Sequence, residues 1–185
     1  LAGSSRASVG GVRDYVLGVE ILNGRAQRLR YGGQVMKNVA GYDVSRLMTG
    51  SLGTLAVITE VSLKVLPLPV ASATLHFEVP AAQALHWLAR WRAQPLPLWA
   101  SHWVQHDGGG HLYLRLRGAA AAVQAAQQRL LQQAQAEGYA AQALSAEADA
   151  TDWEAARHQT LPFFVEPPND QACLWRLSVP PNTGA

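Results

Sequence analysis

Cysteine and lysine are both scarce in this sequence. Among 185 residues the chain contains Cys173 as its single cysteine and Lys37 and Lys64 as its two lysines. One cysteine excludes a disulfide within the chain, so we expect the reducing environment of the cytoplasm. The first 70 residues contain neither histidine nor cysteine. That part of the chain therefore cannot link a prosthetic group covalently through either side chain.

An excess of charge of one sign is also lacking. The formal net charge is +2, and only 15% of the residues are charged. Such a small excess argues against nucleic acid as a main partner. Long apolar runs are missing too, since none approaches the roughly 20 residues that a membrane-spanning helix needs. The hydrophobic content of 49% is typical of a globular protein with one full domain or parts of two.

The composition changes near residue 70, where Pro67 and Pro69 would interrupt a strand. All six tryptophans and all six histidines lie beyond this point. We therefore predict an α+β protein with two domains, residues 1–70 and residues 71–185.

A strand hairpin is predicted early in the first domain. Val19 to Leu22 is an apolar strand pattern, and Asn23-Gly24 favours a two-residue type I′ turn. The chain would return as a partner strand from Arg25 to Tyr31.

The stretch from Lys37 to Pro69 has the clearest local pattern of the first domain. The segment 39–42 predicts a turn, and residues 43–48 predict a short helix with Asp43 as its N-cap. A second glycine-containing turn, Gly50 to Gly53, leads into the next element.

That element is a long buried strand, predicted from Thr54 to Leu66. Apolar residues alternate along it, as expected of a strand with one buried face. The residues on that face are Leu55, Val57, Val61, Leu63 and Val65. Gly53 lies at the start of the strand, where a glycine leaves the backbone open to close approach by a ligand.

The second domain predicts the order strand–helix–strand–strand–helix–strand of the ferredoxin-like fold, with one extra helix. Its helices show apolar spacing of three and four residues, and its strands alternate. The predicted strands are Ala73–Val79, Leu98–Gln105, His111–Arg117 and Ala172–Val179. The predicted helices begin at Pro80, at Ala119 and at a capping box formed by Thr151 and Glu154.

Three spaced motifs carry a family resemblance. They are GGVRDYVLG at residues 10–18, KNVAGYD at residues 37–43 and GSLGTLAVITE at residues 50–60. In this order they resemble the FAD-binding domain of the vanillyl-alcohol-oxidase-like (PCMH-type) flavoproteins. They are most similar to the small FAD-binding subunits of bacterial glycolate oxidases. Leu52 and Ala56 depart from the pattern, where many relatives carry Glu and Gly.

The resemblance implies a fold and a cofactor. We expect the C-terminal half of a PCMH-type FAD-binding domain, followed by the ferredoxin-like cap domain, in a chain that is part of a longer polypeptide. FAD would be bound non-covalently. The residues implied to bind it are Gly3, Ser4, Gly11, Val12, Asp14, Gly53, Thr54, Leu55, Val57 and Ile58. Lys37 would lie near the flavin or, in the alternative, face phosphate or solvent.

The resemblance also implies an activity. The chain would belong to a FAD-binding subunit of a complex that oxidises glycolate to glyoxylate and passes electrons to a further carrier. Its partners would be a larger flavin subunit, an iron–sulfur subunit and a small 2-hydroxy acid. The expected location is the cytoplasm, at the inner face of the membrane through the partner subunits. Two alternatives remain: a non-catalytic flavin-holding or scaffold subunit, and a self-sufficient dehydrogenase of another 2-hydroxy acid such as D-lactate. No residue is identified as the catalytic base.

Two groups of polar residues in the second domain have competing interpretations. His102, His106, Asp107 and His111 suggest a metal site, but their order and the following glycines favour a hairpin without metal. On the predicted outer sheet face, His111, Tyr113, Arg115 and Arg117 have Arg176 and His76 as neighbours. Arginines suit a substrate carboxylate, a subunit interface or solvent equally well.

Overall fold

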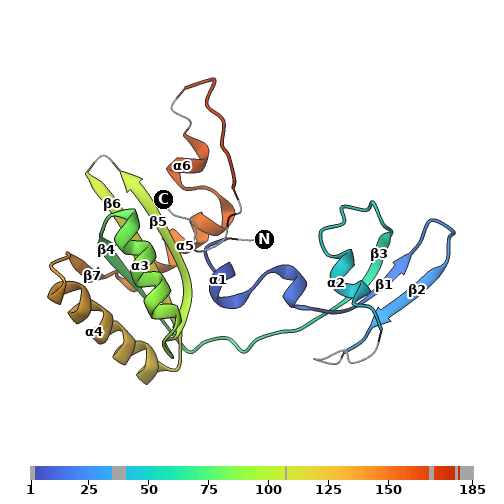
Figure 1. Cartoon of the computed structure of the whole chain (residues 1–185), viewed down its shortest axis with the longest axis horizontal. Coiled ribbons are helices and arrows are strands. Elements are labelled where there is room, and N and C mark those ends of the chain that lie inside the picture. Colours follow the sequence, from blue (N-terminus) through green and yellow to red (C-terminus); the bar gives the residue numbers. More distant parts are fainter. Residues whose placement is uncertain (1–2, 35–40, 107, 167–168, 178, 180–185) are drawn as a thin grey trace. The chain divides into compact units, whose positions relative to one another are not determined.

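The computed structural model describes residues 3–34, 41–106, 108–166, 169–177 and 179 (Figure 1). The chain forms two compact units. Unit 1 comprises Val9–Leu68, and unit 2 comprises Gly3–Ser8 together with Pro69–Ala185. Each unit has its own hydrophobic core.

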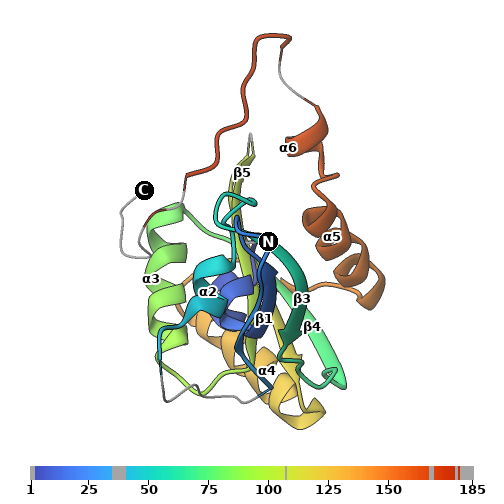
Figure 2. The same ribbon diagram turned by 90° about the vertical axis from the view of Figure 1, so that its right-hand side faces the viewer.

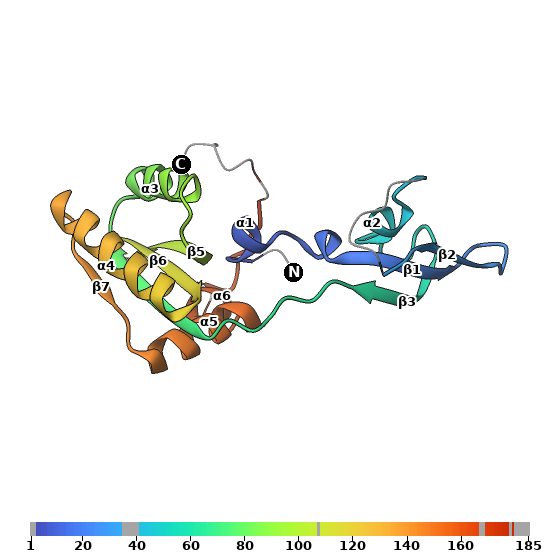
Figure 3. The same ribbon diagram turned by 90° about the horizontal axis from the view of Figure 1, so that it is seen from below.

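Unit 1 is a three-stranded antiparallel sheet with one helix against it. The strands β1 (Val16–Leu22), β2 (Arg28–Gly32) and β3 (Val57–Leu63) lie in the order β2-β1-β3 (Figure 3). Helix α2 (Val44–Met48) packs on this sheet, and the Asp43 side chain accepts a hydrogen bond from the Arg46 amide, as predicted for its N-cap. The core consists of Val16, Val19, Ile21, Met48 and Ala56.

The hairpin between β1 and β2 differs from the predicted two-residue turn. The Asn23 amide donates to the Gln27 carbonyl, so the loop has three residues, and Ala26 has a left-handed φ of 58°. The Asn23 side chain accepts hydrogen bonds from the amides of Arg25 and Gln27. Asn23 thus precedes the turn and organises it through its own side chain, which the Asn-Gly pattern alone does not reveal.

Strand β3 is shorter and more exposed than predicted. A register irregularity interrupts its pairing with β1 at Thr59, since Ile58 pairs with Ile21 and Glu60 with Glu20. The extra residue shifts the alternation of side chains between the two faces of the sheet. Val57 and Val61 therefore point to opposite faces and not to one shared face as predicted. Within the described part of the chain, Val57 is 60% exposed and Val61 46% exposed, so the predicted buried face is wrong there.

Unit 2 confirms the predicted ferredoxin-like order. Along the chain it contains β4 (Ala71–Glu78), α3 (Ala81–Arg92), β5 (Leu98–His106), β6 (Gly109–Gly118), α4 (Ala120–Ala136) and β7 (Ala141–Ala143). The four strands form an antiparallel sheet in the order β5-β6-β4-β7, which can be followed in Figure 1.

The inner face of this sheet packs against α3 and α4. Leu75 and Phe77 of β4 meet Trp87 and Trp91 of α3, and all four side chains are fully buried. The predicted apolar spacing of α3 therefore marks its buried face correctly. Helix α4 ends at Ala136, and Gly138 just after it has a positive φ of 82°, which is typical of a glycine that terminates a helix.

The last part of unit 2 departs from the prediction. Helix α5 (Ala146–His158) begins at Ser145, whose side chain accepts from the Ala148 amide, so Thr151 and Glu154 lie within the helix and form no capping box. The described residues of 172–179 form no strand, and β7 takes the fourth place in the sheet. Helices α5 and α6 (Pro162–Val165) can be followed in Figure 2. Within the described residues, none of the helices has the length and apolarity to cross a membrane.

Candidate functional site

Part of the predicted cofactor site gathers around the loop between α2 and β3 in unit 1. Gly53, Val57 and Ile58 line one open hollow there, and Thr54 and Leu55 lie in the same loop. The residues that complete the hollow are Met48, Gly50, Ser51, Leu52 and Ala56. None of the side chains that line it is ionisable, so the hollow can hold a ligand but offers no acid or base.

The backbone at Leu52 and Gly53 has an unusual conformation. Leu52 has φ of 52° and Gly53 has φ of 78°, both in the left-handed region. A leucine rarely adopts this conformation, and its side chain gains nothing from burial because it is 95% exposed. Strain of this kind persists where surrounding structure or a ligand requires it, which makes the turn a candidate binding element.

This turn also offers free hydrogen-bond donors. The amides of Ser51 and Thr54 are bonded to the carbonyls of Met48 and Ser51. Within the described part of the chain, the amides of Leu52 and Gly53 have no acceptor. Two consecutive free N–H groups in a left-handed turn suit an anionic or polar ligand atom.

Gly53 meets the requirement for close approach of a ligand. A Cβ atom built on it would have no neighbour within 4 Å. The space beside this glycine is therefore open, and a bound cofactor would lie against bare backbone. The loop thus fits a flavin nucleotide in two respects: it offers free backbone N–H donors, and it leaves space beside Gly53.

Gly11, Val12 and Asp14 lie at the other end of the same sheet. Val12 and Asp14 belong to the short 3-10 helix η1 (Val12–Asp14), which Gly11 caps and which leads into β1, where Val16 pairs with Leu63. The Gly53 loop enters β3 at the opposite end, where Val57 pairs with Leu22. Seven residues at about 3.3 Å each separate the two ends by roughly 20 Å. Only a ligand extended along the sheet would meet both loops.

The Asp14 side chain has a structural role in its own loop. Its Oδ2 atom accepts a 2.7 Å hydrogen bond from the Gly11 amide and so closes the turn before β1. The Gly11 amide is therefore occupied by Asp14.

Gly3 and Ser4 belong to unit 2 in the structure. The Ser4 carbonyl accepts a 3.1 Å hydrogen bond from the Ser101 amide of β5, next to helix α1 (Arg6–Val9). They therefore belong to a different compact unit from the other predicted cofactor-binding residues. Lys37, the candidate cation, lies outside the described residues.

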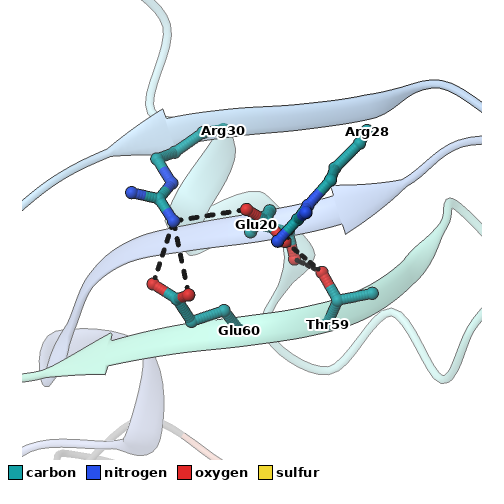
Figure 4. A network of polar contacts seen from close by, with 5 residues as sticks. All are labelled: Glu20, Arg28, Arg30, Thr59 and Glu60. Atoms are coloured by element: carbon teal, nitrogen blue, oxygen red, sulfur yellow. Dashed lines mark hydrogen bonds and ion pairs between the residues drawn. The ribbon is translucent and has the colours of Figure 1, made fainter.

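A charged network crosses the three strands beside the candidate loop (Figure 4). Glu20 of β1 is buried and accepts hydrogen bonds from Arg28 at 2.6 Å and from Thr59 at 2.9 Å. Arg30 connects two carboxylates, because its Nη2 atom lies 3.2 Å from an oxygen of Glu20 and 3.2 Å from an oxygen of Glu60. The hydrogen bond from Arg28, followed by that from Thr59, lowers the pKa of Glu20. Because Thr59 directly follows Ile58, this network fixes the end of the hollow to the sheet.

The outer sheet face of unit 2 contains a row of stacked rings. Tyr113 lies between His76 and His102, with both ring centroids 4.8 Å away, and His102 meets Trp153 edge-on at 4.9 Å. Burial lowers the pKa of His102 to about 4, so this ring is neutral at pH 7. The Nδ1 atom of His102 is buried and has no hydrogen-bond partner in the described structure. These rings mainly pack α5 onto the sheet.

His76 and His111 form a hydrogen-bonded pair. Nε2 of His76 lies 3.0 Å from Nδ1 of His111, and the ring planes differ by 14°. Burial, then the charge of His111, lowers the pKa of His76. The nitrogens face each other head-on, which suits a shared proton better than a common metal ion.

The proposed alternative of a metal site finds no support in the described geometry. Among the residues that the structure describes, no three His, Cys, Asp or Glu side chains are arranged to hold a metal ion. His106 pairs with Gly109 across a tight β5–β6 connection, which confirms the predicted hairpin. Asp107 lies outside the described residues.

Asp149 is the residue of this face that sequence reasoning missed. It projects from α5, is buried, and accepts hydrogen bonds from Thr74, Ser72 and Arg115. The Arg115 guanidinium lies 3.0 Å from its carboxylate. Arg115 is thus an internal ion-pair partner, and part of the predicted open face lies under α5. Because α5 contains four acidic residues, its sequence alone does not distinguish Asp149 from the other three.

Known proteins resemble the chain over different lengths. No protein-family model matches it. It is 44% identical to the glycolate oxidase subunit GlcE of Escherichia coli K12 over 180 residues, which cover 97% of the chain and 45% of GlcE. It is 46% identical over 66 residues to the glycolate oxidase subunit GlcD of Bacillus subtilis 168, covering 36% of the chain and 14% of GlcD.

A third relative is a D-lactate dehydrogenase of Anaerostipes hadrus, 42% identical over 69 residues, or 37% of the chain and 14% of that protein. The chain therefore spans less than half the length of these curated relatives. The matches confirm the resemblance carried by the three motifs: over nearly its whole length the chain is similar to part of the glycolate oxidase subunit GlcE, and over about a third of its length to part of GlcD.

Proposed function

We propose that the chain binds FAD non-covalently through the Gly50–Ile58 loop, as part of a glycolate oxidase subunit. The observation that carries this proposal is the turn at Leu52 and Gly53. It combines left-handed backbone, two free amides and open space beside the glycine. The similarity to GlcE over nearly the whole chain supports FAD as the ligand of this turn.

The proposed substrate is glycolate. Relatives of this chain are named glycolate oxidase subunits, D-lactate dehydrogenases and a D-2-hydroxyglutarate dehydrogenase, and the acids in these names are 2-hydroxy acids. Oxidation of a 2-hydroxy acid removes a hydride from the carbon that bears the hydroxyl group and a proton from that hydroxyl, and bound FAD supplies the hydride acceptor. The contribution of this chain is to hold the cofactor against bare backbone and to fix the end of β3 through Thr59.

A second candidate is a flavin-holding subunit that performs no chemistry alone. The hollow in unit 1 favours this alternative because its lining contains no titratable side chain. A partner would then supply the base. We propose a larger flavin subunit and an iron–sulfur subunit as partners, in the cytoplasm at the inner face of the membrane. The designation of GlcE and GlcD as subunits supports an assembly of several chains.

A chimera tests the proposed function in a full-length protein. In it, this chain replaces the matching 180-residue segment of E. coli GlcE. We expect the purified chimera to contain FAD. Bleaching of its flavin absorbance by glycolate under anaerobic conditions would establish a self-sufficient enzyme, whereas bleaching only after addition of the partner subunits would establish the flavin-holding role. Faster bleaching by D-lactate than by glycolate would show that D-lactate, and not glycolate, is the preferred substrate. A folded chimera without flavin would refute the proposal.

A further inference from the structure

Arg117, near the end of β6, is a partly buried charge without an ion-pair partner in the described part of the chain. Its guanidinium carbon lies 4.9 Å from the centre of the Trp99 ring, so the cation stacks on the indole. Its Nε atom is enclosed and donates no hydrogen bond. Arg115, two residues earlier on the same strand, is bound by Asp149. Arg115 is therefore paired with a carboxylate, whereas Arg117 has no ion-pair partner among the described residues.

The local charges do not balance. The charged groups that act on Arg117 are Arg115, which is positive, and Asp149, which is negative, so with Arg117 itself there are two positive charges and one negative charge. Both oxygens of Asp149 are already in use, because Oδ1 accepts from Thr74 and Oδ2 accepts from Ser72 and Arg115. Burial, then the nearby Arg115 charge, lowers the pKa of Arg117, and Asp149 offsets this only in part. One positive charge remains uncompensated, and a single negative charge would balance it.

We propose that Trp99 and Arg117 form a binding site for one carboxylate group. Since Nε is closed off, the carboxylate would meet the two terminal nitrogens, whose planar arrangement matches two carboxylate oxygens. Stacking on Trp99 holds the guanidinium plane in one orientation and reduces the entropy lost on binding. The single excess charge favours a carboxylate over a phosphate dianion. This site lies in unit 2 and does not depend on the flavin loop of unit 1.

A carboxylate can come from a small acid or from an acidic side chain of another protein. Binding of a carboxylate group, which both sources have in common, is tested by titrating the whole 185-residue chain with sodium acetate. Acetate replaces chloride in the buffer, so the ionic strength stays constant. The indole N–H signals of the six tryptophans serve as the readout by NMR, and Trp99→Phe identifies the signal of Trp99. We expect this signal to shift and saturate, with a dissociation constant on the order of 1–10 mM.

Variants of the arginine separate the site from general salt effects. Arg117→Gln should abolish the saturable shift, and Arg117→Lys should weaken binding roughly tenfold because lysine lacks the planar fork. Arg92→Gln, an equal loss of charge on an exposed position of α3, should leave the affinity unchanged. Unshifted indole signals of the buried Trp87 and Trp91 would show that each variant is folded.

A capped tetraglutamate peptide then distinguishes the two sources. Tighter binding of the peptide than of acetate, at equal carboxylate concentration, indicates a protein side chain, and equal or weaker binding indicates a small acid. The proposal is overturned by a linear, unsaturated shift, or by the same shift in Arg117→Gln. If that variant does not fold, equal acetate affinity of the wild type and Arg117→Lys overturns it as well.

Discussion

Nε1 of Trp153 in α5 donates a 2.7 Å hydrogen bond to Oγ1 of Thr74 in β4, and that hydroxyl in turn donates to Asp149. Both bonds are buried, so one threonine connects two residues of the helix to the sheet. Together with the Arg115–Asp149 ion pair, this chain of contacts attaches α5 to the outer face of the sheet of unit 2.

Loss of the Asp149 charge should loosen α5. Asp149→Asn keeps the shape but leaves Arg115 without an anion, and breaking such a largely buried pair costs about 3 kcal/mol of unfolding free energy. Glu154→Gln is the control within the same helix, because Glu154 and Arg157 are 58% and 68% exposed and their pair contributes well under about 1 kcal/mol. Urea unfolding followed by tryptophan fluorescence measures both. Equal effects of the two substitutions would contradict the assigned role of Asp149.

Acid should weaken unit 1 through Glu20. The pKa of Glu20 is lowered from its ordinary value of 4.5 in the folded protein, chiefly by the hydrogen bond from Arg28. The stabilisation is therefore fully present above the ordinary pKa and is lost as the pH falls through the folded pKa. The difference in urea midpoint between wild type and Glu20→Gln should shrink as the pH falls below 4.5. A difference that stays constant with pH would rule out a charge effect at this position.

The left-handed Ala26 offers a stabilising substitution. Ala26→Gly should raise the unfolding free energy by about 0.5–1 kcal/mol, because glycine relieves the strain at φ of 58° at a smaller cost in unfolded-state entropy. Ala122→Gly, at an exposed position inside α4, should instead destabilise by about 1 kcal/mol. Thermal unfolding of both variants checks the opposite signs.

The first 70 residues also predict how the flavin is held. They contain no histidine or cysteine, so this part of the chain offers neither side chain for a covalent bond. Acid precipitation of the FAD-loaded chimera should leave all the flavin absorbance in the supernatant. Flavin that remains with the precipitated protein would show a covalent bond formed elsewhere.

Local patterns in the sequence predicted the fold where local contacts decide it. The spacing of Ala84, Trp87 and Trp91 marks the buried face of α3 because helical periodicity alone sets that face. The apolar alternation of residues 172–179 misled because alternation does not supply a neighbouring strand. The fourth strand of the sheet, beside β4, is instead Ala141–Ala143, and three residues are too few to show an alternating apolar pattern.

The candidate site was predictable only in part, for similar reasons. The motif at residues 50–60 located the hollow, but the bulge at Thr59 depends on its hydrogen bonds to Glu20, 39 residues away. Likewise, Asp149 reaches Thr74 across 75 residues, and no local pattern signals such a contact. Gly11 to Asp14 match the family motif as well, yet the Asp14 side chain closes its own turn.

The most direct test of FAD binding at the Gly53 loop is the ratio of FAD to protein in the GlcE chimera after gel filtration. Gly53→Ala and Gly138→Ala carry similar backbone strain, with φ of 78° and 82°, and neither added Cβ has a neighbour within 4 Å. The two glycines differ in location, since Gly53 lines the hollow and Gly138 follows the C-cap of α4. We predict that Gly53→Ala lowers the FAD content at least severalfold and that Gly138→Ala leaves it unchanged. Equal FAD content in the two variants would contradict a cofactor site at Gly53.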